Sequence, residues 1–259
     1  MKTVVLSFDD ARKDFYTRAF PILNKYGLTA TLNVISDFIL NPRNYSCFES
    51  ANNEPIHIEE LLLCQNQGIE IACHGHLHLN TKADILENIK TLKELGVKFP
   101  HGIGFASPNS ELTMSNIYQY GISDLIYDKT LSYVRSGIQI RREGLLYTAI
   151  SLLSKYTKSH KLWYWLNYKN IIQSKHSSTL LPSITIHSYT TLNQIMYLIN
   201  NMPDHATVIL MFHSICKHND SGYGKDKWYW DYESFDQLCC WLSHTNNITV
   251  CNTLNYIQQ

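Results

Sequence analysis

The sequence lacks the features that would mark a membrane protein, a nucleic-acid-binding protein or a disulfide-stabilised protein. No apolar run approaches the roughly 20 residues that span a bilayer, and Met1-Lys2 leads into a strand pattern without a signal region. The 22 basic residues balance 22 acidic ones, which gives no electrostatic case for nucleic acid as a partner. The 7 cysteines lack regular spacing, which argues against a disulfide framework. We therefore expect a cytoplasmic protein with reduced cysteines.

What the sequence contains is a repeated alternation of strand-like apolar runs and helix-like segments. The predicted strands are residues 2–7, 28–35, 69–73, 102–106, 122–127, 183–187, 206–212 and 248–251. The predicted helices are residues 14–26, 58–66, 81–95, 190–201 and 233–244. Repeated strand–helix units indicate a parallel sheet, here closed on itself. A chain of 259 residues fits one α/β barrel, so we predict a single domain over residues 1–259.

Three polar clusters follow predicted strands at the points where those strands end. They are Ser7-Phe8-Asp9-Asp10, His74-Gly75-His76-Leu77-His78 and Met211-Phe212-His213. Each has an ordinary explanation by itself: a turn cap, a surface pair of imidazoles, or a hydrogen-bonded core histidine. The carboxyl ends of parallel strands are also where active sites are built. The coincidence of all three clusters at such ends favours one functional site.

The residue types in these clusters suit a metal ion with an acid/base pair. Adjacent aspartates at a strand end point to opposite sides, so one can bind a metal while the other faces substrate. His74 and His78 are four residues apart, a spacing that places both rings on one side of a helical turn. One carboxylate and two imidazoles suit Zn²⁺ with an open position, and Co²⁺, Mn²⁺ or Ni²⁺ fit the same ligands. Asp9 can then accept the proton of water, and His213 can protonate the leaving group.

These motifs resemble those of the polysaccharide deacetylases with the NodB-homology domain, carbohydrate esterase family 4. The family carries a Thr/Ser-Phe-Asp-Asp motif, a His-(Ser/Thr)-x-x-His motif, a third motif with proline and a late Leu-x-His. Residues 7–10 match the first motif fully, and the resemblance extends to about residue 257, with weak matching over about 140–182. It implies a distorted (β/α)7-type barrel that removes an N- or O-linked acetyl group from an acetylated sugar or glycan.

The resemblance also implies roles for individual residues. Asp9 would be the catalytic base and His213 the catalytic acid, while Asp10, His74 and His78 would be the metal ligands.

The sequence departs from the family pattern at two informative positions. Gly75 replaces the hydroxyl residue of the second motif, so the ligand loop is expected to be looser or braced by His76. Ala106 stands where many relatives have an arginine that pairs with the catalytic base. We hypothesise that Arg135 reaches Asp9 from a neighbouring strand and holds it ionised.

Other residues are expected to contact the substrate. Pro108 and Asn109 belong to the third motif, and the backbone N–H of Asn109 can hold the oxyanion whatever its side chain. Trp228 and Trp230 lie in an aromatic loop soon after His213. Their rings suit stacking on a sugar, and capping of the barrel is an equal alternative.

A segment over about residues 140–182 does not fit the plain barrel. It has no Asp or Glu between Gly144 and Leu181, and it carries Lys155, Lys158, Lys161, Lys169 and Lys175 among several aromatic residues. One interpretation is a helical insertion whose aromatics pack on the barrel and whose lysines are solvated. The other is peripheral contact with an anionic membrane or a lipid-linked, phosphate-bearing sugar.

Three alternatives to carbohydrate deacetylation stay open at this stage. The same scaffold can hydrolyse a non-carbohydrate amide or a formyl group. It can be a catalytically silent barrel that binds a metal or a carbohydrate, or a membrane-associated scaffold that uses the basic insertion.

Overall fold

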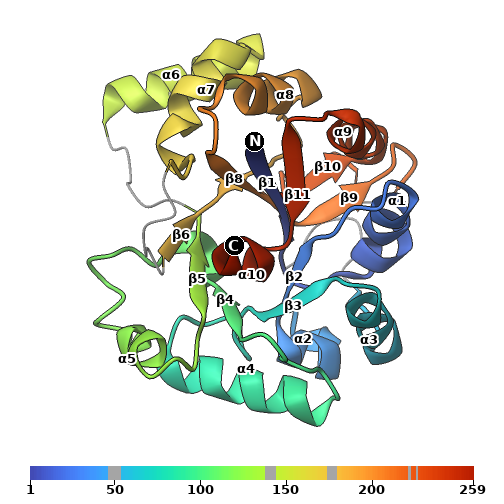
Figure 1. Ribbon diagram of the computed structural model, residues 1–259, viewed down its shortest axis with the longest axis vertical. Coiled ribbons are helices and arrows are strands. Elements are labelled where there is room, and N and C mark those ends of the chain that lie inside the picture. The colour runs from blue at the N-terminus through green and yellow to red at the C-terminus, as the bar shows by residue number, and fades with distance from the viewer. Residues whose placement is uncertain (46–53, 138–143, 174–179, 221–222, 226) are drawn as a thin grey trace.

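The computed structural model describes the chain except residues 46–53, 138–143, 174–179, 221–222 and 226. In these described residues, helices surround a ring of strands (Figure 1). The strands are β1 (Lys2–Phe8), β2 (Thr31–Val34), β3 (Glu70–Cys73), β4 (Gly104–Ala106), β5 (Tyr133–Ser136), β6 (Leu180–Pro182), β7 (Ile184–Thr185), β8 (Thr207–Phe212), β9 (Ser214–Cys216), β10 (Tyr229–Asp231) and β11 (Ile248–Cys251). The α-helices are α1 (Phe20–Lys25), α2 (Ser36–Leu40), α3 (Ile58–Asn66), α4 (Lys82–Glu94), α5 (Ile122–Tyr127), α6 (Leu145–Thr157), α7 (His160–Asn167), α8 (Leu192–Asn201), α9 (Tyr232–His244) and α10 (Thr253–Gln258). Shorter helical segments are η1 (Phe15–Ala19), η2 (Pro42–Tyr45), η3 (Pro108–Ser110) and η4 (Tyr168–Asn170).

The ring is parallel throughout, in the order β5, β4, β3, β2, β1, β8. It closes through residues 180–185, because β6 pairs with β5 while β7 pairs with β8. If β6 and β7 are taken as one strand divided at Ser183, the described ring has seven members, as a (β/α)7-type barrel requires. The predicted α/β barrel is therefore confirmed. An extra strand, β11, pairs with the first half of β1 and leaves its second half to β2.

Side chains that alternate along the strands build two hydrophobic cores. Those that point outward, such as Val4 and Phe105, pack under the helices. Those that point inward near the strand starts, such as Val5, Tyr133 and Ile209, form a smaller core inside the barrel. The next inward-pointing residue of each strand, two residues later in the sequence, lies near the carboxyl end of the strand. The barrel therefore changes from apolar at one end to polar at the other.

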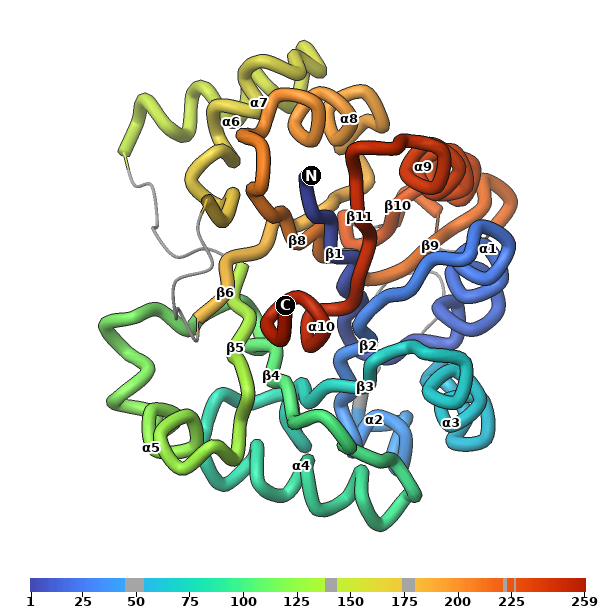
Figure 2. The backbone as a smooth tube through the Cα atoms, viewed as in Figure 1, coloured from blue at the N-terminus to red at the C-terminus, as the bar shows by residue number. Residues whose placement is uncertain are grey.

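The C-terminal helix α10 seals the apolar end. Its backbone crosses the middle of the ring in Figure 2, and Leu254 belongs to the inner core. The buried carboxylate of Glu70 accepts the backbone N–H of Leu254 at 2.9 Å and the hydroxyl of Thr31 at 2.8 Å. The hydroxyl of Tyr133 donates to the other oxygen of Glu70 at 2.6 Å. A satisfied polar network thus joins α10 to three strands of the barrel.

Residues 122–127, predicted as a strand, form helix α5 instead. A short apolar run does not distinguish a strand from a helix by periodicity alone. Here Ile122 and Leu125 are both buried, and their spacing of three places them on one face of a helix. The prediction of a strand was therefore wrong at this position.

Most of the described part of the predicted insertion is helical, in α6, α7 and η4, as the helical interpretation expected, while its last residues form β6 of the barrel. Trp163 is buried and Tyr164 donates to the backbone oxygen of Asn201, which fastens α7 to α8. Helix α6 leaves several apolar side chains exposed, namely Leu145, Leu146, Leu152, Leu153 and Tyr156. Lys175 lies outside the described residues. Across the described ranges, the longest and most apolar helices still fall short of what a membrane crossing requires.

We predict that Tyr133→Phe lowers the free energy of unfolding by about 1–3 kcal/mol, because Glu70 then keeps a buried oxygen without its donor. Chemical denaturation measures this change. The matched control is Tyr127→Phe, since Tyr127 is 91% exposed, and it should change stability by less than about 0.5 kcal/mol. Equal stabilities for the two variants would contradict the role given to the network.

Candidate active site

Asp9 lies just beyond β1, at the polar end of the barrel, and is held by two donors. Its side chain is 3% exposed. The Nη2 of Arg135 lies 2.7 Å from both carboxylate oxygens, and the Nδ2 of Asn33 donates to Oδ1 at 2.8 Å. Burial by itself raises the pKa of Asp9, but the charge of Arg135, together with the imidazoles of His74 and His213, outweighs burial and lowers the pKa below its ordinary value. The carboxylate is therefore ionised and fixed in orientation.

The contact hypothesised between Arg135 and Asp9 is thus present in the structure. Arg135 comes from β5, where it is the register partner of Ala106 on β4. The preceding inward pair follows the same pattern, since Tyr133 is partnered by Gly104. A Cβ on Gly104 would lie only 2.1 Å from the ring of Tyr133. Small residues on β4 therefore accompany the large inward side chains of β5, and Ala106 fits this pattern beside Arg135.

Asp10 has a separate arginine, which the sequence analysis did not identify. Arg12 donates to Oδ2 of Asp10 from Nε at 2.9 Å and from Nη2 at 2.7 Å. Burial raises the pKa of Asp10, but the guanidinium of Arg12, together with the imidazoles of His74 and His213, holds the pKa well below its ordinary value. Because Arg12 occupies Oδ2, the other oxygen is left facing His74, with 3.6 Å between Oδ1 and Nε2.

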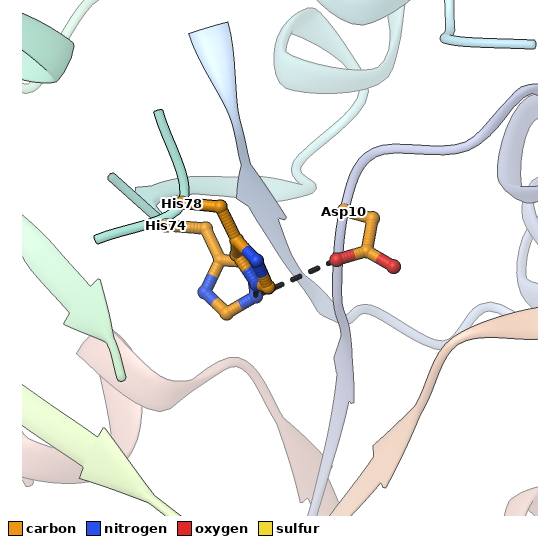
Figure 3. A group of neighbouring side chains, drawn as sticks. All are labelled: Asp10, His74 and His78. Carbon is orange, nitrogen blue, oxygen red and sulfur yellow. Dashed lines mark hydrogen bonds and ion pairs between the residues drawn. The ribbon is translucent and has the colours of Figure 1, made fainter. Parts of the chain in front are cut away.

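His74 and His78 present their Nε2 atoms to the same point as Asp10 (Figure 3). The Nδ1 of His74 lies 2.9 Å from the carbonyl oxygen of Ala106, which can only accept, so Nδ1 carries the proton and Nε2 keeps its lone pair. The two Nε2 atoms are 3.3 Å apart. Burial, then the charge of His74, lowers the pKa of His78 to about 4, so this ring is neutral near pH 7.

This set of donors fits a divalent cation. The three ligand atoms lie within 4.8 Å of one another. A carboxylate oxygen and two imidazole nitrogens are ligands that zinc and similar metals take, with one position left open. Arg12 on Asp10 and the Ala106 carbonyl on His74 are the kind of outer partners that orient metal ligands. Without a cation the site favours a proton on His74 instead: burial lowers the pKa of this ring, but the carboxylates of Asp9 and Asp10 together raise it above its ordinary value.

The spacing of His74 and His78 predicted a helical turn, but the two residues lie on a loop. Residues 74–78 form a loop after β3, and left-handed backbone at Gly75 (φ 81°) and His78 (φ 61°) turns the chain back. Asp84 of α4 accepts the N–H groups of Leu77 at 2.8 Å and Leu79 at 3.0 Å. The predicted same-side placement is correct, but the loop and its hydrogen bonds produce it.

The loop is braced rather than loose. His76 forms a hydrogen bond through Nδ1 with the hydroxyl of Ser36 at 2.8 Å, so His76 braces the loop, which was one of the two alternatives expected from the sequence. The backbone N–H of Asp37 donates to the carbonyl oxygen of His76 at 3.1 Å. These contacts join the metal-ligand loop to the start of α2.

His213 follows β8 directly and faces the two aspartates. Its Nδ1 is buried and has no hydrogen-bond partner among the described residues. Burial lowers the pKa of His213, while the carboxylates of Asp10 and Asp9 act in the opposite direction. Its ring centre lies 4.8 Å from that of Trp228, which is 36% exposed. An imidazole beside a partly exposed indole suits proton transfer next to a flat surface on which a ring can stack.

The remaining predicted contact residues differ in their placement. Trp230 is 2% exposed, stacks near Phe212 and donates its Nε1–H to the carbonyl oxygen of Thr190 at 2.7 Å. It is a core residue with no free face for a sugar, so the stacking role predicted for it is not supported.

Pro108 and Asn109 form η3 at the carboxyl end of β4. Pro108 is buried, whereas Asn109 is exposed with left-handed backbone.

Comparison with known proteins agrees with this geometry. Residues 1–119 match the family model described as polysaccharide deacetylase. No curated protein matches the sequence. Among solved structures, a family 4 acetyl xylan esterase from Clostridium thermocellum with a cobalt ion is similar, with a TM-score of 0.53 and 14% identity over 99% of this chain and 90% of that one.

A second similar structure is a family 4 pseudoenzyme from Bacillus anthracis. Its TM-score is 0.51 and its identity 13%, over 98% of this chain and 65% of that one. At these identities the likeness concerns the fold. An argument for catalysis must therefore come from the side chains of this chain.

We predict that Gly75→Ser, which restores the hydroxyl usual in the family, weakens metal binding by about tenfold or more. A Cβ at Gly75 would lie 2.5 Å from Oδ2 of Asp84 and 2.9 Å from the backbone of Leu79, so the ligand loop must shift. Isothermal titration with Zn²⁺ measures the affinity. Gly68→Ser is the matched control, because Gly68 also has positive φ but nothing within 4 Å. Unchanged affinity in Gly75→Ser would contradict the account of the loop.

Proposed function

We propose that this protein is a metal-dependent hydrolase that removes an N- or O-linked acetyl group from a carbohydrate. One observation carries the proposal: two adjacent buried aspartates are each held by a different arginine and face different neighbours. Asp10 faces the two imidazoles, and Asp9 stays outside that ligand set. The match of residues 1–119 to the polysaccharide deacetylase family model supports the substrate class.

The metal would be held by Asp10, His74 and His78, with Zn²⁺ the first choice and Co²⁺, Mn²⁺ or Ni²⁺ fitting the same donors. When bound, a divalent cation polarises a carbonyl group and lowers the pKa of water to roughly 7.

The side chains around this position supply the proton transfers. Asp9 lies beside the ligand set, with 3.9 Å between its Oδ2 and Nε2 of His74. Arg135 keeps Asp9 ionised, so the carboxylate accepts the proton of the attacking water at an oxygen already fixed in place. Asn33 holds the same carboxylate from β2. The base is thereby oriented by two strands other than its own.

His213 would donate the proton that the leaving nitrogen or oxygen needs. It follows β8, where Phe212 is the register partner of Phe8 on β1, so His213 comes from the strand beside that of Asp9 and both can serve the same acetyl group. Trp228 packs beside it and offers a partly exposed ring to the sugar. The backbone N–H of Asn109 is the proposed donor to the oxyanion.

Two of the alternatives use the same residues. A formyl or other amide hydrolase would share the base and the acid, and would differ only in the substrate pocket. A catalytically silent barrel would keep the ligands but not need the Arg135–Asp9 pair. Contact with a membrane or a lipid-linked substrate stays a prediction, for which the exposed apolar side chains of α6 and the lysines beside them are the relevant surface.

The test is acetate release by the metal-loaded protein from N-acetylated chito-oligosaccharides and from O-acetylated xylan. Asp9→Asn should lower kcat by about 100-fold or more, because general-base catalysis contributes at least that factor. Asp204→Asn, at an exposed position, is the matched control and should leave kcat unchanged. Formate release without acetate release would favour the formyl alternative, and no release from any acylated sugar would favour the silent barrel.

A further inference from the structure

A cavity of about 170 Å³ lies between the helical insertion and the barrel. Helices α6 and α7 form one wall through Ser154, Lys155 and Trp163, and η4 adds Lys169. The opposite wall is the chain that closes the barrel, with Ser183 and His187. In Figure 1 the two insertion helices lie beside α8, next to the strands of this closure. None of the proposed catalytic or metal-binding residues lines the cavity.

The chemistry of the lining is basic and hydrogen-bonding. Lys155 and Lys169 are its charged residues, and no carboxylate lines it among the described residues. The sequence reinforces this bias, since residues 144–181 contain neither Asp nor Glu. Most of the other lining residues carry hydroxyl or amide groups. Such a lining attracts an anion and supplies donors to its oxygens.

Two buried polar atoms in the lining have no hydrogen-bond partner in the part of the chain that the structure describes. Ser154 is 2% exposed, and its Oγ has no hydrogen bond among the described residues. The same holds for the buried Nδ1 of His187. Burial, then the charge of Lys227, lowers the pKa of His187 to about 3, so its neutral ring offers one donor and one acceptor. Buried polar groups are normally paired, and an unpaired set in one cavity indicates a missing ligand or solvent.

Two residues of the cavity wall contact residues of the candidate active site. Ser183 accepts a hydrogen bond at 3.0 Å from Nη1 of Arg135, the residue that holds Asp9. The ring of His187 lies 5.1 Å from that of Trp228, and the ring of Trp228 also lies 4.8 Å from that of His213. Through Ser183 and His187, a group bound in the cavity would therefore lie near the side chains proposed for catalysis.

We propose that this cavity binds an anionic group of the substrate, and that the preferred substrate is an acetylated sugar carrying a phosphate close to the acetylated position. The proposal deepens the proposed function and rests on it. Lys155 and Lys169 supply the charge, while Ser154 and His187 supply hydrogen bonds to the anion. The insertion, which is additional to the barrel, would then determine substrate specificity.

The experiment has a binding arm and a kinetic arm, both on the full metal-loaded chain. Isothermal titration with inorganic phosphate tests the cavity without any turnover. Acetate release is then compared between N-acetylglucosamine and N-acetylglucosamine 1-phosphate. We expect phosphate binding that weakens at least tenfold in Lys155→Met/Lys169→Met. We also expect kcat/KM to favour the phosphorylated sugar at least tenfold, and this preference to disappear in the double variant while the rate on the neutral sugar stays unchanged.

Lys90→Met/Lys161→Met is the matched control, because it removes the same charge from positions outside the cavity and should retain both properties. Absence of phosphate binding to the wild-type chain would overturn the proposal, as would a preference that survives in Lys155→Met/Lys169→Met. Phosphate binding without preference for the phosphorylated sugar would mean that the cavity holds free phosphate and not substrate. If neither sugar releases acetate, the proposed function fails, and the binding arm still decides whether the cavity is an anion site.

Discussion

The buried ion pair between Arg135 and Asp9 is the interaction on which the polar end of the barrel depends. Both residues are almost fully buried, and Nη2 of Arg135 lies 2.7 Å from each carboxylate oxygen. A buried pair contributes little net stability, but losing one partner leaves an uncompensated charge that costs about 3–5 kcal/mol. The pair therefore acts as a constraint on geometry. It joins β5 to β1 across the barrel and, through Ser183, to the segment that closes the ring.

Two neighbouring carboxylates can have different roles because their partners differ. Asp9 is held by Arg135 and Asn33 from other strands, whereas Asp10 is held by Arg12 in the same turn. The left-handed backbone at Asp10, with φ of 72°, turns this side chain toward the imidazoles. Each arginine keeps its own carboxylate ionised, so neither aspartate must share a proton with the other.

Much of this arrangement could be predicted from the sequence, because strand alternation and strand ends are local properties. Apolar runs located most of the strands, and the polar residues after them located the site. The absence of an arginine at Ala106 was enough to predict that Arg135 reaches Asp9. That prediction used only the missing arginine and the lack of another obvious arginine nearby. The structure supplies its physical reason, because inward positions recur every second residue along the adjacent strands of a closed barrel.

The errors arose where tertiary contacts decide between local alternatives. Residues 122–127 have an apolar pattern compatible with either a strand or a helix, and packing selected the helix. His74 and His78 meet through a loop whose shape depends on Asp84, ten residues beyond His74. Trp230 and Trp228 are two residues apart in an aromatic loop, and only the fold buries one and exposes the other. Arg12 was missed because nothing in its immediate sequence indicates that its guanidinium turns back to Asp10.

The central claim is that Asp10 binds a metal while its neighbour Asp9 does not. Elemental analysis of purified Asp10→Asn and Asp9→Asn, each loaded with Zn²⁺ and freed of excess ion, tests it most directly. The account predicts about one zinc per chain in wild type and Asp9→Asn, and a large loss in Asp10→Asn. Equal zinc content in the two variants, whether retained or lost, would contradict the division of roles between the two aspartates.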